Sequence, residues 1–216
     1  MAIAFDALTA HAGATATSIT FSHTVASSNP VLFVCVTDSS SNLVTGVTYN
    51  GTAMTLVGTS SAPSDRYIHT YCLAAPSTGA NNVVVTASAS NSMRPFAVSY
   101  TGAHQSVQAD VSDTNTTTTN TNSYSRTLTT LEDNCWTMIF IKNNAAVPAA
   151  GSGTTQRDAS TWATFIGDSN SATSPAGSST LAATTTNASG WGSVMTTIVP
   201  DTYSESSSFI PQIIMS

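Results

Sequence analysis

The chain has 216 residues, of which 41% are hydrophobic and only 7% are charged, and its net charge at pH 7 is −6. This length suits one β-sandwich or barrel, and the hydrophobic content is too high for a disordered protein. One lysine and four scattered arginines give no basic surface for a phosphate backbone, so we expect no nucleic-acid partner. No apolar run approaches the roughly 18 residues of a membrane span, and the first residues do not resemble a signal peptide. We therefore expect a soluble protein, made without a cleaved signal, that has no membrane partner.

The low fraction of charged residues predicts a neutral, polar surface. Charged residues usually make up about a quarter of a globular chain, so the exterior here must be polar through hydroxyl and amide groups. Neutral surfaces rich in Thr, Ser and Asn suit exposed particle surfaces and repetitive assemblies, because low charge weakens the repulsion between neighbouring copies.

Short β-branched or aromatic runs recur along the chain between clusters of Gly, Pro, Asn and Ser, and almost no window has the spacing of an amphipathic helix. This pattern predicts an all-β fold, a jelly-roll-type antiparallel β-sandwich with about a dozen strands. The expected strands are 16–23, 30–38, 45–50, 53–58, 66–74, 82–89, 94–101, 123–129, 134–142, 153–158, 161–168, 179–186 and 191–199.

Two hairpins are predicted in the first half. Asn50 and Gly51 supply the two positive-φ residues that a two-residue type I′ turn requires, between Val47 and Leu56. A second hairpin is expected from the strand Tyr67 to Leu73 and the strand that begins at Asn82, across a turn containing Pro and Gly.

The second half of the chain echoes the first in the order of its strands. Val31 to Val36 corresponds to Cys135 to Ile141, and three later pairs of strands follow in the same order. We therefore consider two pseudo-repeated halves, with chance resemblance between strand-rich segments as the alternative. The later pairs are Arg66 to Leu73 with Thr161 to Asp168, Asn82 to Ala87 with Leu181 to Thr186, and Phe96 to Thr101 with Val194 to Val199.

These strands predict one sandwich domain over residues 1–203. The Thr/Asn-rich stretch 113–122 between the halves is a surface connection or a solvent-facing edge strand. Residues 204–216 form an apolar tail, which we expect to be either a packed final strand or an arm that adds to a neighbouring subunit. The candidate arm residues are Phe209, Ile210, Ile213 and Ile214.

The segment from Pro30 to Gly102 resembles a known type of module in the order of its motifs. These motifs are the apolar strand Val31 to Val36, the hairpin Val47 to Val57, the strand Tyr67 to Leu73 with its following Ala-Pro-Ser-Thr-Gly, the strand Asn82 to Ala87, and Ala97 to Ala103. Together they resemble a concanavalin-like jelly-roll module of phage virion proteins and bacterial surface proteins. The second half resembles the rest of such a module more loosely. The resemblance implies a sandwich used for structure, decoration or recognition, and it carries no shared catalytic residues.

Three cysteines lie far apart in sequence, each within an apolar run that we predict to be a strand. Cys35, Cys72 and Cys135 are odd in number and show no CxxC or Cys/His spacing. We therefore expect buried free thiols rather than disulfides or a metal site.

The sequence shows no recognisable catalytic motif. There is no Gly-x-Ser-x-Gly, and His69 is expected on the face of a strand rather than as a base. A glycosidase would need two carboxyl groups across a cleft, but the only two glutamates, Glu132 and Glu205, lie in polar, turn-like segments. Asp110 and Asp113 form a close carboxylate pair, and a solvated turn accounts for it better than a calcium site. We expect no enzymatic activity, no cofactor and no metal.

Two tryptophans are candidate platforms for sugar rings. An aromatic face packs well against the apolar face of a pyranose, and Trp162 and Trp191 are both candidates for this role. Core packing is the competing interpretation, because both residues lie in or beside predicted strands.

Taken together, these features favour a phage virion structural protein, a capsid decoration or fibre-associated subunit that acts by binding and assembly. We expect it at the virion surface, bound to virion proteins such as a capsid protein, as a homo-oligomer. The alternative is a carbohydrate-binding or receptor-binding module that recognises surface glycans, and a polysaccharide-degrading enzyme is the least favoured possibility.

Overall fold

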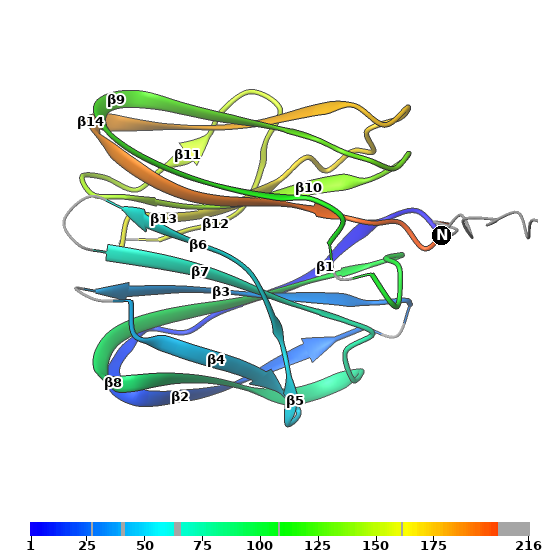
Figure 1. Ribbon diagram of the computed structural model, residues 1–216, viewed down its shortest axis with the longest axis horizontal. Helices are drawn as coiled ribbons and strands as arrows, with labels where there is room; N and C mark the ends of the chain where they lie inside the picture. The colour runs from blue at the N-terminus through cyan, green and yellow to red at the C-terminus, as the bar shows by residue number, and fades with distance from the viewer. Residues whose placement is uncertain (27, 40–41, 63–65, 108, 161, 203–216) are drawn as a thin grey trace, which may run out of the picture.

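The computed structural model describes residues 1–26, 28–39, 42–62, 66–107, 109–160 and 162–202. Within these residues the chain forms fourteen strands and no helix, and two antiparallel sheets pack against each other (Figure 1). The prediction of an all-β sandwich is therefore confirmed. The described residues contain no helix that is long and apolar enough to cross a membrane.

The first sheet is built from the first half of the chain, in the order β5-β4-β8-β3-β7-β6, with β1 and β2 also paired to β8. Its central strand β3 is buried almost throughout, which explains its unbroken apolar sequence. The strands are β1 (Ala4–Ala10), β2 (Ala14–Val25), β3 (Val31–Ser39), β4 (Val44–Tyr49), β5 (Thr52–Ala53), β6 (Thr55–Ala62), β7 (Arg66–Ala74) and β8 (Gly79–Thr101).

The second sheet is built from the second half, in the order β11-β14-β10-β13-β12, with β9 also paired to β14. Its central strand β10 is buried at every position. The strands are β9 (Ser112–Thr129), β10 (Trp136–Asn143), β11 (Ala149–Ala150), β12 (Thr155–Ser160), β13 (Thr164–Asp168) and β14 (Ser178–Ile198).

The two halves share one pairing scheme, as the internal echo in the sequence predicted. In the first half β3 lies between β7 and β8, and in the second half β10 lies between β13 and β14. The outer strands correspond as well: β2 and β4 pair with β8 as β9 and β11 pair with β14, and β6 pairs with β7 as β12 pairs with β13. The pseudo-repeat is therefore present in the topology of the described residues.

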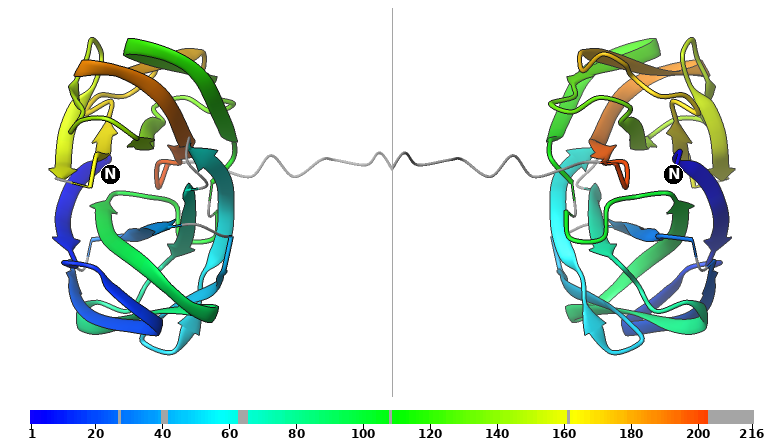
Figure 2. Two further views of the ribbon diagram at one scale, coloured as in Figure 1. Left: turned by 90° about the vertical axis from the view of Figure 1, so that its left-hand side faces the viewer. Right: turned by 90° about the vertical axis from the view of Figure 1, so that its right-hand side faces the viewer.

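Three apolar cores hold this arrangement together, because each sheet curls around a core of its own and both sheets share a central one (Figure 2). Alternate residues of β3 point to different cores, since side chains alternate between the faces of a strand. The central core includes Phe33, Cys35, Phe96, Val98 and Tyr100 from the first sheet and Trp136, Met138, Phe140, Val194 and Ile198 from the second. The first-half core includes Leu32, Val34, Tyr49, Val83 and Val85, and the second-half core includes Ile139, Ile141, Phe165, Leu181 and Trp191.

The sequence-based prediction of the hairpins was half right. Asn50 and Gly51 have φ values of 48° and 77°, and Tyr49 pairs with Thr52, so the first hairpin is confirmed. The second hairpin was wrong, because β3 lies between β7 and β8 and these two strands do not pair. The turn near Pro76 therefore leads from one neighbour of β3 to the other.

Several strands also differ from the prediction. The strand β1 was not predicted, and β8 and β14 are continuous strands where two shorter ones had been expected in each case. The Thr/Asn-rich stretch 113–122 lies within β9, so the edge-strand alternative is the one that the structure shows. The tail 204–216, with Phe209, Ile210, Ile213 and Ile214, lies outside the described residues.

Candidate functional site

A polar pocket with basic residues opens at one end of the sandwich, and we call it the cationic pocket. Its volume is about 440 Å³, and two basic side chains, Arg66 and Lys142, line it together with the indole of Trp162. None of the described lining residues is acidic. The full lining set is Ser39, Arg66, Ser92, Lys142, Asn144, Ala145, Trp162 and Ala163.

The cationic pocket lies where the central strands of both sheets end. Ser39, the last residue of β3, pairs with Arg66, the first residue of β7. In the second sheet Lys142 of β10 pairs with Thr164 of β13, and the amide of Asn143 bonds to the carbonyl of Ala163. Continuing this register outward brings Asn144 and Trp162 to the same end of their sheet. Each half of the pseudo-repeat thus contributes the end of an equivalent strand pair.

Lys142 is the most unusual residue of the pocket, because only 3% of it is exposed. Its ammonium group donates hydrogen bonds to the carbonyl oxygens of Asn143, at 2.7 Å, and of Trp162. Burial lowers the pKa of Lys142 to about 7, and the positive charge of Arg66 lowers it further in the same direction. An incoming negative charge would favour the charged form of this buried amine, because its pKa is lowered and the described lining holds no acidic partner for it.

Trp162 is held in place by residues of the first sheet. The guanidinium carbon of Arg94 lies 5.6 Å from the centroid of the Trp162 ring and 5.4 Å from that of Phe96. A Cβ atom on Gly13 would come within 3.2 Å of the Trp162 ring, so glycine, at a φ of 92°, allows the indole to lie against the turn between β1 and β2. The Nε atom of Arg94 is buried and has no hydrogen-bond partner among the described residues.

The other candidate platform, Trp191, has a different position. It is completely buried in the second-half core, stacks on Tyr124 with a centroid distance of 5.4 Å, and donates through Nε1 to the carbonyl of Thr121. The prediction that Trp191 offers a face to a sugar is therefore not supported, because core packing occupies it. Of the two predicted tryptophans, only Trp162 lines a pocket.

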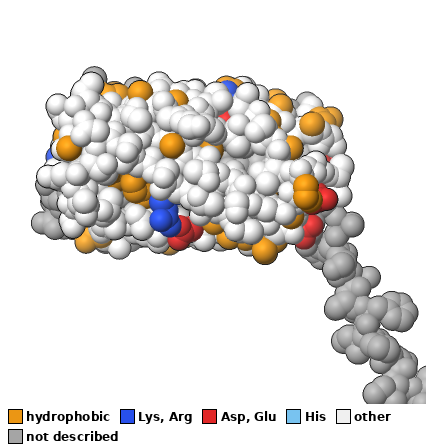
Figure 3. Space-filling model, turned by 90° about the horizontal axis from the view of Figure 1, so that it is seen from above, with side chains coloured by type: hydrophobic (Ala, Val, Ile, Leu, Met, Phe, Trp, Pro, Cys, Tyr) orange, Lys and Arg blue, Asp and Glu red, His pale blue; other side chains and the backbone are white. Residues whose placement is uncertain are grey.

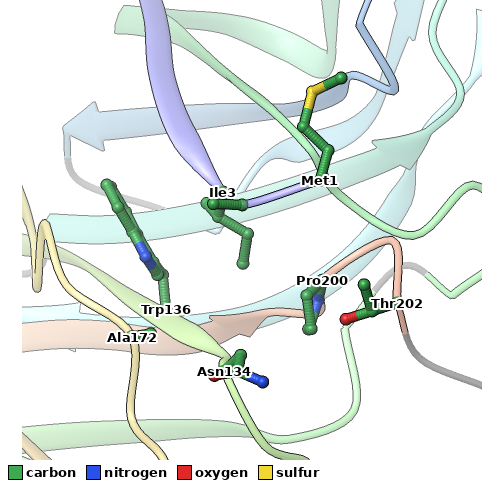
Figure 4. A pocket seen from close by; sticks show the side chains of 8 residues that line it. Met1, Ile3, Asn134, Trp136, Ala172, Pro200 and Thr202 are labelled. Carbon is green, nitrogen blue, oxygen red and sulfur yellow. The ribbon is translucent and has the colours of Figure 1, made fainter.

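A second pocket, which we call the apolar pocket, opens at the opposite end, where the first residues lie close to the end of β14. Its volume is about 350 Å³, and Figure 4 shows Ile3, Trp136 and Pro200 around one space. Thr202, the last described residue, also lines it. The full lining set is Met1, Ala2, Ile3, Asn134, Trp136, Ala172, Pro200 and Thr202.

The histidines do not build a site with these pockets. His69 is buried, with Nε2 3.3 Å from Oδ2 of Asp38 and Nδ1 3.1 Å from the hydroxyl of Thr59. His23 is buried as well and lies within hydrogen-bond distance of the hydroxyls of Thr9 and Ser99. Neither histidine lines the cationic or the apolar pocket. These contacts satisfy buried polar groups inside the first half.

Three further expectations from the sequence concern the cysteines, a metal site and Asp110. Cys35, Cys72 and Cys135 are free and buried, as predicted. Among the described residues no group of three or more His, Cys, Asp or Glu side chains is placed to hold a metal ion. Asp110 accepts from the hydroxyl of Thr197 and from the amide of Leu131.

The main feature of the cationic pocket could not be found from the sequence. The basic residues are scattered along the chain, whereas strand pairing places Arg66 and Arg94 at one end of the first sheet and the packing of the second sheet adds Lys142. No short motif joins these three residues, since they lie on β7, β8 and β10. The internal repeat was the only related signal in the sequence, and it does not predict which strand ends meet.

Comparisons of the chain with protein families, with curated proteins and with solved structures find no match.

Proposed function

We propose that this protein is a structural subunit of a phage particle, a capsid decoration or fibre-associated protein, and that it acts by binding and assembly rather than by catalysis. The observation that carries this proposal is the neutral exterior of a rigid sandwich. Figure 3 shows the face seen from above Figure 1, where charged side chains are few and lie among many neutral ones. Such a face can contact repeated copies of itself or of a shell protein with little charge repulsion.

The long strand β9 supports an assembly role. It has 18 residues, pairs with β14 alone among the described strands, and is an edge of the sheet as described. Near its start, side chains of β6 cover it, because the hydroxyl of Ser60 donates to the carbonyl of Asn115 at 2.7 Å. Natural edges are often protected by Lys or Pro, and β9 contains neither. Its Thr- and Asn-rich outer part offers backbone groups for lateral contact with another subunit.

The apolar pocket also supports an assembly role. Thr202 lines this pocket, and the sequence continues from there into a tail whose apolar residues include Phe209, Ile210, Ile213 and Ile214. We propose that the tail of one subunit fills the apolar pocket of a second copy. Ile3, Trp136 and Pro200 would supply the apolar contacts.

The size of the assembly in solution tests this function. We expect the full chain to form a homo-oligomer by size-exclusion chromatography with light scattering, and a chain ending at Thr202 to lose it. Full-length protein should also bind particles that lack it. Ile3→Asp, which places a charge in the apolar pocket, should act like the truncation, whereas Leu131→Asp, at an exposed position elsewhere, should not. A monomeric full-length chain that ignores such particles would contradict the proposal.

Carbohydrate binding is a second candidate function, and one observation favours it. Trp162 lies in a pocket with hydroxyl, amide and basic side chains, which is the usual composition of a site that binds polar ligands with an apolar face. A sugar-binding subunit could also belong to a particle surface, so the two functions are compatible.

A further inference from the structure

We propose that the cationic pocket binds an acidic saccharide, a sugar that carries a carboxylate, with the carboxylate held between Arg66 and Lys142 and the sugar ring beside Trp162. This inference rests on the carbohydrate-binding alternative and names its site and ligand class. It does not depend on the assembly role.

The basic residues of this chain fall into two groups. Arg126 and Arg157 each form a salt bridge, with Asp113 and Asp168. Arg66, Arg94 and Lys142 form none with a described carboxylate, although they gather around one pocket. With only five Lys and Arg residues in 216, three at one place without a described carboxylate partner are not a general property of the chain. Within the part of the chain that the structure describes, no carboxylate neutralises these three charges.

The hydrogen-bond capacity of Lys142 leads to the same conclusion. An ammonium group has three N–H bonds, and among the described residues two carbonyl oxygens, of Asn143 and Trp162, accept from it. No described residue accepts from the third N–H, which can donate to a ligand in the pocket that Lys142 lines. A carboxylate there would gain a charge-assisted hydrogen bond and would offset the cost of keeping the ammonium group buried.

The remaining lining residues suit a sugar better than a bare anion. Ser39, Ser92 and Asn144 offer hydroxyl and amide groups, which match the hydroxyls of a sugar ring. The indole of Trp162 offers an aromatic surface for the C–H face of that ring. A simple anion such as phosphate could accept from the same hydroxyl, amide and basic groups, but it would gain nothing from the indole. A volume of about 440 Å³ is well within the range of small-molecule sites.

Arg94 fixes the aromatic surface of this site. Its guanidinium lies over the Trp162 ring and so links the indole, which belongs to the second half, to β8 of the first half. We therefore expect Arg94 to act as a positioning residue. Its loss should change the selectivity between sugars more than the strength with which the pocket binds the carboxylate.

Calorimetric titration of the full chain tests the proposal with five probes: glucuronic acid, N-acetylneuraminic acid, glucose, N-acetylglucosamine and inorganic phosphate. We expect one or both acidic sugars to bind, and the neutral sugars and phosphate to bind at least about tenfold more weakly. Arg66→Gln should weaken acidic-sugar binding by about tenfold or more, for the same reason. Arg126→Gln is the matched control, since it removes the same charge elsewhere, and it should leave the affinity unchanged.

A second variant protects the test against a folding artefact. Lys142→Met removes the buried ammonium group and should abolish acidic-sugar binding, while thermal unfolding and circular dichroism check that each variant is folded. Phosphate binding as tight as the acidic sugars, or equal binding by wild type and Arg66→Gln, would overturn the proposal. Equal or tighter binding of the neutral sugars would overturn it but leave the carbohydrate-binding function standing. No binding of any sugar would overturn both.

Discussion

The hydroxyl of Tyr100 donates a 2.8 Å hydrogen bond to Oδ2 of Asp168, and this bond crosses from the first sheet to the second inside the buried centre of the sandwich. Arg157 completes the group, because its Nε and Nη2 atoms bond to both oxygens of the same carboxylate at 2.6 and 2.9 Å. Burial raises the pKa of Tyr100 well above its usual value, so the phenol stays a donor. The Arg157 guanidinium also lies 4.3 Å from the ring centroid of Phe5 in β1.

This polar group predicts unequal effects for two conservative substitutions. Asp168→Asn leaves Arg157 without its counter-charge and should lower the free energy of unfolding by about 3–5 kcal/mol. Tyr100→Phe removes one hydrogen bond while Arg157 still holds the carboxylate, and should cost about 1–2 kcal/mol. Urea denaturation measures both. Asp113→Asn, in the partly exposed pair with Arg126, is the control and should cost about 1 kcal/mol or less. Equal losses at all three positions would contradict this account.

Close contact between the sheets predicts a strong effect at Gly192 of β14. A Cβ atom there would lie 2.4 Å from the carbonyl oxygen of Ser61 in β6, and backbone cannot move aside as a flexible side chain can. Gly192→Ala should therefore lower the free energy of unfolding by about 1–3 kcal/mol. Gly46→Ala is the control, since nothing lies within 4 Å of its Cβ position and no loss is expected. Similar stability of both variants in denaturant would show that the sheets are not in contact here.

The buried His23 predicts a loss of stability in mild acid. Desolvation lowers its pKa to about 4, and the carboxylate of Asp6 opposes that shift only in part. Between about pH 6.5 and 4 the unfolded chain therefore takes up a proton that the folded chain does not, so stability falls as the pH falls through this window. The contribution should be up to about 2 kcal/mol. Unfolding free energies measured from pH 7 to 4 should fall less steeply in His23→Gln than in the wild type, and parallel curves would show that His23 does not contribute.

The affinity of the cationic pocket should depend on pH through Lys142. Because its pKa is about 7, half of the free protein lacks the charge at that pH, and an anion binds the charged form. The charged groups described around it, Arg66 and Arg94, are both positive. Acidic-sugar affinity should therefore be highest below pH 7 and fall by up to about tenfold for each pH unit above it. In Arg66→Gln the decline should begin at higher pH, because the repulsion from Arg66 is removed. An affinity that stays constant from pH 6 to 9 would contradict this role of Lys142.

The strands could be predicted from sequence where residues alternate or form unbroken apolar runs, as in β3 and β10. The prediction failed where a strand lacks such a signal. The segment Ala4–Ala10 is rich in Ala and contains Asp6, so nothing in it indicated β1. In β8 residues 90–93 were expected to separate two strands, whereas β8 continues through them and pairs with β2 at residues 91–93 and with β1 after them.

The candidate site was harder to predict, for a physical reason. Trp162 was chosen for its chemistry alone, and the same argument selected Trp191, which belongs to the second-half core. Burial separates the two residues, and burial depends on which strand covers which face. Arg66 and Lys142 come from different sheets, so only the packing of one half on the other brings them together.

The central core has a consequence for the stability of each half on its own. Each half supplies one wall of that core, so a fragment containing only β1 to β8 would expose Phe33, Val98 and Tyr100 to water. Such a fragment would need a matching partner from solution, and its stability would vary with concentration. In the 216-residue chain, residues 102–111 connect the two halves, so the association of the halves is intramolecular. The second half supplies the partner surface within the same chain, so formation of the central core does not depend on protein concentration.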